Sequence, residues 1–205
     1  QRKVYNAYLT EAKNTLVSNI EAGSFEKNKM EILALITKLR QICLYPPLCV
    51  NNFNDESAKL KQCMELIVEG ISSGHRILVF SSFTSMFPKI SEMLDNENIK
   101  YYILTGKTDL NSRAKMVEEF NNSDEVNVFL ISLRAGGTGL NLTGADMVIH
   151  YDPWWNIAAE NQATDRSYRI GQKRNVQVYK LVTKNTIEEK MIQMQDRKKE
   201  LLDII

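Results

Sequence analysis

The chain has 205 residues, 43% of them hydrophobic, which is enough to bury a sizeable core and excludes a mainly disordered protein. Its 26 basic and 25 acidic residues leave a formal charge of +1, so any nucleic-acid site must be a local patch rather than a global basic field. Three cysteines without dense spacing exclude a disulfide framework, and no apolar run reaches the roughly 18 residues that a membrane span needs. The start, QRKVYNAYLT, is no signal peptide, so we expect an intracellular protein, in the cytoplasm or nucleoid of a prokaryote or the nucleus of a eukaryote.

Two amphipathic helices are predicted at the start of the chain. Apolar residues recur every fourth position over residues 4–20, and a second apolar stripe covers residues 32–43. The second helix must end before Pro46 and Pro47, because a proline disfavours helical backbone in the residue before it. Two helices alone bury little surface, so residues 1–50 are interpreted as a helical appendage rather than a domain.

After a predicted loop over residues 45–57, helices and short apolar strands alternate. Asp109 is the expected N-cap of the helix over residues 110–120. The other expected helices cover residues 60–71, 86–95 and 185–205, and the expected strands are 76–80, 100–104, 126–131, 147–151 and 176–182. This alternation predicts an α/β domain with a mainly parallel sheet, helices on both faces and ligands at the carboxyl ends of the strands.

The last predicted helix opens with a pattern like a capping box, Thr186 to Glu189. Its middle, QMQDRKKE, is polar, and we expect it to be solvated.

A glycine-rich turn follows the strand over residues 126–131 and contains Gly136, Gly137, Gly139 and Gly144. Backbone amides in such a turn can face an anion. The turn is neither GxGxxG nor GxxxxGK(S/T), and by itself it is a weak signal.

The chain also contains a Gly-Lys-Thr sequence at residues 106–108, which follows a predicted strand. It is excluded as a P-loop, because the first glycine of that motif would fall on Tyr101. Its amides, together with Lys107 and Arg113, could hold a nucleic-acid phosphate. The alternative is an ordinary turn between a strand and a helix.

A helix is predicted after the tryptophan pair, and Gln162, Arg166 and Arg169 lie on one face of it at i, i+4 and i+7. Asp165 is placed to hold a guanidinium, and Gly171 is free to end the helix. Two planar, permanently charged donors suit bidentate recognition of a phosphate. A solvated face of salt bridges is the alternative for an arbitrary helix.

Trp154 and Trp155 follow a strand at its carboxyl end, where an aromatic residue can stack on nucleic acid or wedge against it. We expect Trp154 to pack into the core instead. His75 and His150 have no partners at the spacing of a metal site or a catalytic triad, and the three cysteines lack a paired CxxC, so we read all of them as structural and predict no metal site.

Several segments together resemble the Swi/Snf-type ATPases, which are helicase-like DNA translocases of superfamily two. Five segments resemble motifs IV, IVa, V, Vb and VI of that family in order and spacing. They are, in the same order, ILVFSSFTSM (77–86), LTGKTDLNSR (104–113), LISLRAGGTGLNLTGAD (130–146), DPWWN (152–156) and NQATDRSYRIGQKRNVQVYKL (161–181). LRQICLYPPL (39–48) is similar to the segment that leads into the second lobe. The resemblance implies that residues 51–205 form a RecA-like three-layer domain, and that residues 1–50 include the lead-in from a first lobe.

The resemblance also implies roles for single residues. Arg166 and Arg169 would be arginine fingers that reach ATP, supported by Gln162 and Asp165, while Gly139 and Asn141 approach the nucleotide. Residues expected to line a track for double-stranded DNA are Ser81, Thr105, Gly106, Lys107, Arg113, Arg134 and Trp155.

The residues that would hold ATP and Mg²⁺ are expected mainly on the first lobe. This sequence has no GxxxxGK(S/T), and neither acidic pair, Asp55-Glu56 or Asp124-Glu125, follows an apolar strand as magnesium binding would require. The resemblance therefore implies a C-terminal half that is inactive alone and works with its N-terminal lobe, DNA and, in some members, a DNA-bound protein. The alternatives are a lobe of another superfamily two helicase, acting on RNA or DNA, and a non-catalytic module that binds DNA or protein.

Overall fold

The computed structural model describes residues 1–21, 29–51, 53, 56–136, 139–167, 172 and 174–203. The helices are α1 (Arg2–Glu21), α2 (Lys29–Leu44), α3 (Ala58–Ser72), α4 (Phe87–Asn96), α5 (Leu110–Asn122), α6 (Leu133–Gly136), α7 (Ile157–Thr164) and α8 (Ile187–Asp203), with 3-10 turns η1 (Pro46–Leu48) and η2 (Thr84–Met86). The strands are β1 (Ile77–Ser81), β2 (Tyr101–Leu104), β3 (Val128–Ser132), β4 (Met147–His150) and β5 (Gln177–Lys180).

Within the described residues the strands form one sheet in the order β2-β3-β1-β4-β5, and every neighbouring pair is parallel. The three central strands, β1, β3 and β4, are buried along their whole length, which explains why their sequences are continuous apolar runs. The predicted mainly parallel sheet is confirmed.

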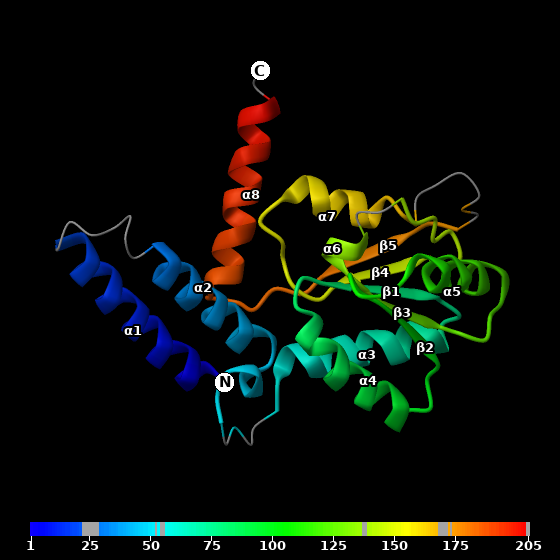
Figure 1. The fold of residues 1–205 in the computed structure, drawn as a ribbon, viewed down its shortest axis with the longest axis horizontal. Coiled ribbons are helices and arrows are strands. Elements are labelled where there is room, and N and C mark those ends of the chain that lie inside the picture. The colour runs from blue at the N-terminus through cyan, green and yellow to red at the C-terminus, as the bar shows by residue number, and fades with distance from the viewer. Residues whose placement is uncertain are drawn as a thin grey trace.

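The core has two faces because successive side chains of a strand point to opposite sides of the sheet. Ile77 and Val79 of β1 pack with residues of α3 and α4, while Leu78 and Phe80 pack with residues of α5 and α7. The sheet therefore lies between two helical layers. Figure 1 shows α3 and α4 below the sheet, α6 and α7 above it, and α5 at the right, level with the strands.

The N-terminal helices α1 and α2 lie antiparallel beside the sheet and share a small core of their own, which includes Tyr5, Leu39 and Ile42 (Figure 1). Both were predicted, and the helical appendage is present. The predicted loop over residues 45–57 is wrong at residues 46–48, because Pro46 starts the 3-10 turn η1, in which its carbonyl accepts from the Cys49 amide at 3.0 Å.

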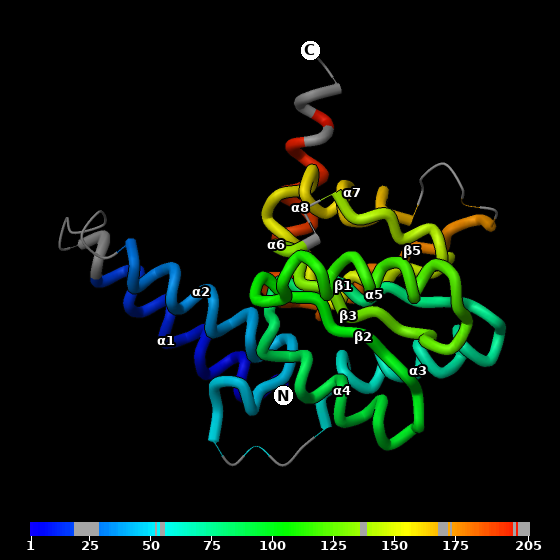
Figure 2. Tube along the Cα trace, turned by 45° about the vertical axis from the view of Figure 1, so that its right-hand side comes forward, coloured from blue at the N-terminus to red at the C-terminus, as the bar shows by residue number. Residues whose placement is uncertain are grey.

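Helix α8 begins beside α2 and runs away from the sheet, so its C-terminal part stands clear of the body in both views (Figures 1 and 2). The capping pattern forms in a shifted way: Thr186 accepts from the Glu188 amide at 3.3 Å, and the Glu189 carboxylate accepts from the Asn185 amide at 2.9 Å. The prediction of a solvated middle is wrong at Gln195, which is buried. No helix among the described residues is both long and apolar enough to cross a membrane.

Candidate functional site

Because all the paired strands are parallel, their carboxyl ends meet at one edge of the sheet. Most of the predicted site residues follow these ends. Ser81 closes β1, Thr105 follows β2, Arg134 lies just after β3, and Trp155 lies beyond β4. The topology therefore brings together residues that are up to 74 positions apart, from Ser81 to Trp155.

The turn after β2 is held by its own polar groups. Thr108 Oγ1 accepts from the Thr105 amide at 3.0 Å, and Thr105 Oγ1 accepts from the Lys107 amide at 3.2 Å. Arg113 donates to the carbonyl oxygens of Thr108 at 2.8 Å and Thr105 at 3.1 Å. The turn is thereby fixed with Gly106 and Lys107 exposed at its tip.

The helix that follows this turn begins where the sequence predicts. Asp109 accepts from the Ser112 amide at 2.9 Å, as an N-cap does, and α5 starts at Leu110.

A one-turn helix, α6, comes directly after β3, where the sequence predicted a glycine-rich turn. Leu133 and Ala135 face the core, while Arg134 is exposed. The short helix includes Gly136, and Gly137 lies outside the described residues.

The loop beyond α6 exposes Gly139 and Asn141. Gly139 has φ of +58°, in the left-handed region that only glycine enters without strain. At the other end of the loop the Gly144 amide donates to Asn121 at 2.9 Å, and a β-carbon there would lie 2.8 Å from the Phe120 carbonyl oxygen. Glycine is therefore needed for the loop to pack against α5.

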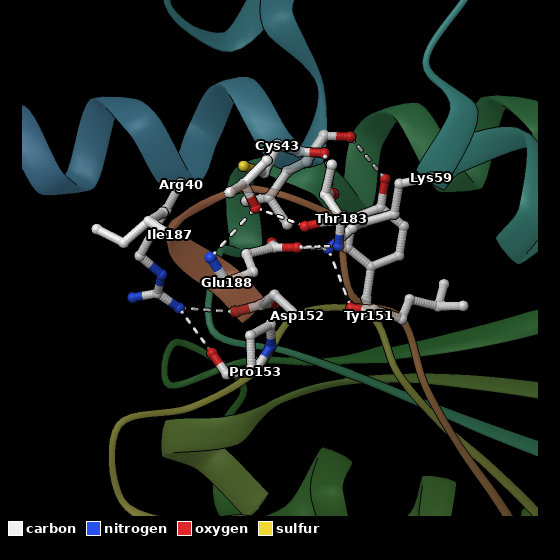
Figure 3. Close-up of polar contacts among 12 residues, drawn as sticks. Arg40, Cys43, Lys59, Tyr151, Asp152, Pro153, Thr183, Ile187 and Glu188 are labelled. Atoms are coloured by element: carbon white, nitrogen blue, oxygen red, sulfur yellow. Dashed lines mark hydrogen bonds and ion pairs between the residues drawn. The ribbon is translucent and has the colours of Figure 1, made fainter. Parts of the chain in front are cut away.

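Asp152, just beyond β4, binds groups from the end of β1 and from α2, and the sequence analysis assigned it no role. Its buried carboxylate accepts from Ser81 Oγ at 2.6 Å, from the Ser82 amide at 3.1 Å and from the Ser82 hydroxyl. It also pairs with Arg40 of α2 at 3.0 Å (Figure 3). Ser81 is therefore fully buried and joins β1 to β4, rather than facing solvent.

Arg40 is buried and binds several groups at the same edge. It donates to the Pro153 carbonyl and to Ser82 Oγ, each at 3.0 Å, and its guanidinium lies 4.7 Å from the Phe83 ring centroid. Burial lowers the pKa of Arg40, and Asp152 opposes that shift. The segment LRQICLYPPL, which includes Arg40, could have drawn attention to this residue but not to its partner.

Residues 152–156, here called the Trp loop, hold the two tryptophans in different environments. Trp154 is half-buried and packs against the core, as predicted, whereas Trp155 is 42% exposed. The Trp154 amide donates to Glu160 at 3.0 Å, and its carbonyl oxygen accepts from Gln195 of α8. Glu160 also pairs with Lys180 at 2.5 Å.

The prediction of one helical face is wrong for Gln162 and Arg166, the two of its three residues that the structure describes. Helix α7 ends at Thr164. The Asp165 amide still bonds four residues back, but the next two amides bond three residues back: Arg166 to the Ala163 carbonyl at 3.3 Å and Ser167 to the Thr164 carbonyl at 3.1 Å. Ser167 Oγ also donates to the Thr164 carbonyl at 2.8 Å, which favours this early end.

The consequence is a division among the predicted residues. Gln162 and Asp165 are exposed, whereas Arg166 lies in the turn with 2% of its surface exposed. Arg169 and Gly171 lie outside the described residues.

Hydrogen bonds of Leu142 and Gln172 join the loop over residues 139–145 to the turn after α7. The Leu142 amide donates to the Arg166 carbonyl at 3.0 Å. Gln172 donates to the carbonyl oxygens of Ala145 at 2.6 Å and Ser167 at 3.1 Å. Gln172 was not among the predicted site residues, although its place at the end of RIGQ could have drawn attention to it.

The histidines and cysteines are structural where the chain is described. His150 stacks on Phe80 and lies 2.8 Å from Thr164 Oγ1, and burial lowers its pKa to about 4. His75 pairs with Asp146 at 3.1 Å. The cysteines are free, and in the described part of the chain no group of three or more His, Cys, Asp or Glu residues could hold a metal ion.

The parallel sheet, its helical layers and the polar carboxyl edge define a RecA-like lobe. The model of the helicase conserved C-terminal domain matches residues 58–171, so the chain belongs to that family. Within the family it is a C-terminal lobe of the Swi2/Snf2 type.

Solved structures and curated relatives carry that assignment. The C-terminal domain of the Sulfolobus solfataricus SWI2/SNF2 ATPase superimposes with a TM-score of 0.80 at 32% identity, over 100% of this chain and 84% of that one. The core of the same ATPase in complex with dsDNA also gives 0.80, at 37% identity, over 98% of this chain and 43% of that one.

An uncharacterized ATP-dependent helicase of Mycoplasma pneumoniae is 44% identical over 86% of this chain, and the putative ATP-dependent helicase/translocase YwqA of Bacillus subtilis is 40% identical over 87%. The chain spans only 17% and 20% of the length of these two relatives.

Proposed function

We propose that this chain is the second lobe of an ATP-dependent translocase that moves along double-stranded DNA. The observation that carries the proposal is the carboxyl edge of the parallel sheet, where Gly106, Lys107, Arg134 and Trp155 are all exposed. Support comes from the related ATPase core whose structure is of a complex with dsDNA. In this assignment residues 51–205 form the lobe, and residues 1–50 are the appendage and lead-in.

The proposed DNA contacts divide into groups that touch DNA and groups that hold them. Lys107 and Arg134 supply positive charge for phosphates, and the backbone at Gly106 can approach closely because it has no side chain. Trp155 supplies a flat apolar surface at the rim.

Three other residues of the predicted track act from behind these contacts. Arg113 and Thr105 are committed to the turn that carries Lys107, and Ser81 is committed to Asp152. We propose that these three position the loops rather than contact DNA.

We further propose that this lobe contacts ATP, because the names of the related helicases describe them as ATP-dependent. The residues of this chain fit a phosphate-rich ligand in their chemistry: Gln162 offers an amide, Gly139 a left-handed turn at an exposed backbone, and Arg166 and Arg169 permanently charged planar donors. Bound ATP would supply the phosphoanhydride bond whose hydrolysis drives movement.

Arg169 and Arg166 are proposed as arginine fingers, with Asp165 and Gln162 supporting them and Asn141 near the nucleotide. Arg166 is buried next to the loop over residues 139–144, so as a finger it would act at close range. We expect Mg²⁺ and most contacts to ATP on an N-terminal lobe of the same protein.

The contacts between Leu142 and Arg166, and between Gln172 and Ala145, join two parts of the proposed nucleotide side. They hold the loop that ends at Gly144 and the turn that carries Arg166 as one unit. A displacement of Arg166 would therefore reach the loop that carries Gly139 and Asn141, the other part of the proposed nucleotide side.

The test is a comparison of translocation with strand separation in the complete enzyme. We expect ATP-dependent displacement of a third strand from a DNA triplex, which reports movement along a duplex, and no unwinding of a forked duplex. Efficient unwinding, or a preference for RNA, would favour a different helicase of the superfamily. Neither movement nor nucleotide-dependent DNA affinity would favour a non-catalytic binding module.

A further inference from the structure

The Trp loop is held from outside the sheet by two helices far apart in the sequence. From α2, Arg40 donates to the Asp152 carboxylate and the Pro153 carbonyl, both at 3.0 Å (Figure 3). From α8, Gln195 donates to the carbonyl of Trp154. Proline has no amide hydrogen and the Trp154 amide donates to Glu160, so the backbone of residues 153 and 154 is fully bonded.

The burial of Gln195 stands out within α8. Its neighbours Gln193, Met194, Asp196 and Arg197 are exposed, while Gln195 retains 5% of its surface. A buried amide costs free energy unless it is hydrogen-bonded, and the bond it makes is to the Trp loop.

Helix α8 is anchored two turns before this contact. Glu188, Met191 and Gln195 are buried and lie on one face of the helix, at i, i+3 and i+7. Glu188 pairs with Lys59 of α3 at 2.5 Å and accepts from the Thr183 amide at 2.8 Å (Figure 3). The start of α8 is thus fixed to the domain, and Gln195 is presented to the Trp loop from a fixed base.

Trp155 lies between residues that are held by hydrogen bonds. Before Trp155 in the chain, residues 152–154 are held by Arg40, Glu160 and Gln195. After it, Asn156 caps α7 by accepting from the Ala158 amide at 3.0 Å. The Arg40 guanidinium lies 6.0 Å from the Trp155 ring centroid, within the range of a cation–π contact.

We propose that Gln195 and Arg40 are positioning residues that hold Trp155 at the rim of the DNA track, so that α2 and α8 together set the geometry of that contact. The proposal rests on the proposed function of the rim. Neither residue needs to touch DNA.

The loop can be followed directly, because Trp154 and Trp155 are the two tryptophans of the chain. The variant is Gln195→Met, which keeps the length and helix propensity of the side chain and removes its amide donor. We expect red-shifted emission and stronger acrylamide quenching without DNA, with an unchanged circular dichroism spectrum. The matched control is Gln193→Met, an exposed position of the same helix, which should leave both signals unchanged.

The second measurement is affinity for a DNA duplex at fixed salt. Without the hydrogen bond from Gln195, the Trp loop should spend more time away from its position at the rim. Affinity for the duplex should therefore fall by roughly three- to tenfold. Trp155→Ala supplies the reference for a rim without its aromatic residue, and Arg40→Lys, which keeps the charge but loses the planar fork, should change fluorescence and affinity in the same direction as Gln195→Met.

The outcomes separate the positioning role from the DNA role. Unchanged fluorescence in Gln195→Met would overturn the proposal. The proposal would also fail if Gln195→Met changed the fluorescence but bound DNA normally, while Trp155→Ala bound DNA weakly. If the fluorescence of Gln195→Met changes but Trp155→Ala binds DNA normally, Gln195 positions the Trp loop and the proposed role of the rim in DNA binding is wrong. If Gln195→Met does not fold, Gln195→Asn, which keeps the amide one methylene short of the carbonyl, is read by the same criteria.

Discussion

Lys59 Nζ lies 2.5 Å from Glu188 Oε2, and both side chains are almost wholly buried, with 4% and 0% of their surfaces exposed. Lys59 also donates to the Leu181 carbonyl at 3.1 Å. The pair joins α3 to α8 across 129 positions of the sequence. A buried ion pair is a weak source of net stability, but removing one partner leaves the other charge without compensation.

Lys59→Met should therefore destabilise the chain by about 3–5 kcal/mol, measured as the free energy of unfolding in urea. Adding Glu188→Gln should recover part of that loss, since the double variant buries no charge and keeps an acceptor for the Thr183 amide. Lys61→Met, at an exposed position of the same helix, should change stability by no more than about 0.5 kcal/mol. A Lys59→Met variant as stable as this control would contradict the expected cost.

Arginine substitutions test the proposed nucleotide side. In the complete enzyme, Arg169→Ala or Arg166→Ala should abolish DNA-stimulated ATP hydrolysis, because an arginine finger contributes about 10³ to 10⁵ in rate. DNA affinity should change little in either variant. Near-normal turnover in both would remove the arginine fingers from the mechanism.

Salt dependence tests the proposed DNA side. Lys107→Ala and Arg134→Ala should each reduce the slope of log affinity against log salt by about one, since each removes one phosphate contact. Lys115→Ala is the matched control, because Lys115 is exposed on α5 and pairs with Glu119 at 3.7 Å. If all of these variants had the same salt slope as the wild type, Lys107 and Arg134 would not contact DNA phosphates.

The stability of the fold should depend on pH through His150. Burial lowers the pKa of its imidazole from 6.5 to about 4, although the nearby Glu160 opposes the shift. The unfolded chain binds a proton at this residue below pH 6.5 while the folded chain stays neutral, so the stabilisation is complete above pH 6.5 and is lost as pH falls toward 4. The loss is at most about 3 kcal/mol.

The measurement is the free energy of unfolding of the wild type minus that of His150→Asn, from pH 7.5 to 4. Carboxylates elsewhere titrate in both proteins and largely cancel in the difference. A flat difference over this interval would show that His150 titrates alike in the folded and unfolded chains.

The sheet and most helices could be predicted from sequence because their signals are local. Residues 77–80 of β1 form a continuous apolar run, and Asp109 caps α5 as its residue type suggests. The carboxyl edge followed from the parallel topology, which brought Thr105, Arg134 and Trp155 to one side.

The missed residues depend on partners far away in the chain. Nothing near Asp152 indicates that it binds Arg40, 112 positions earlier, and nothing in the polar run around Gln195 indicates that it is buried against Trp154. The prediction for Arg166 was wrong for a local reason. Hydrogen bonds to carbonyls three residues back, including that of the Ser167 hydroxyl, end α7 two residues before Arg166.

The end of β4 has a consequence for the order in which the chain folds. Tyr151 donates to the Leu44 carbonyl at 3.0 Å and Asp152 pairs with Arg40, so two successive residues attach α2 across more than a hundred positions. Contacts of such long sequence separation form late, because the intervening chain must first be ordered. We expect the amides of α2 to gain protection in pulsed hydrogen exchange after those of β1, β3 and β4, so that the appendage docks onto a finished sheet.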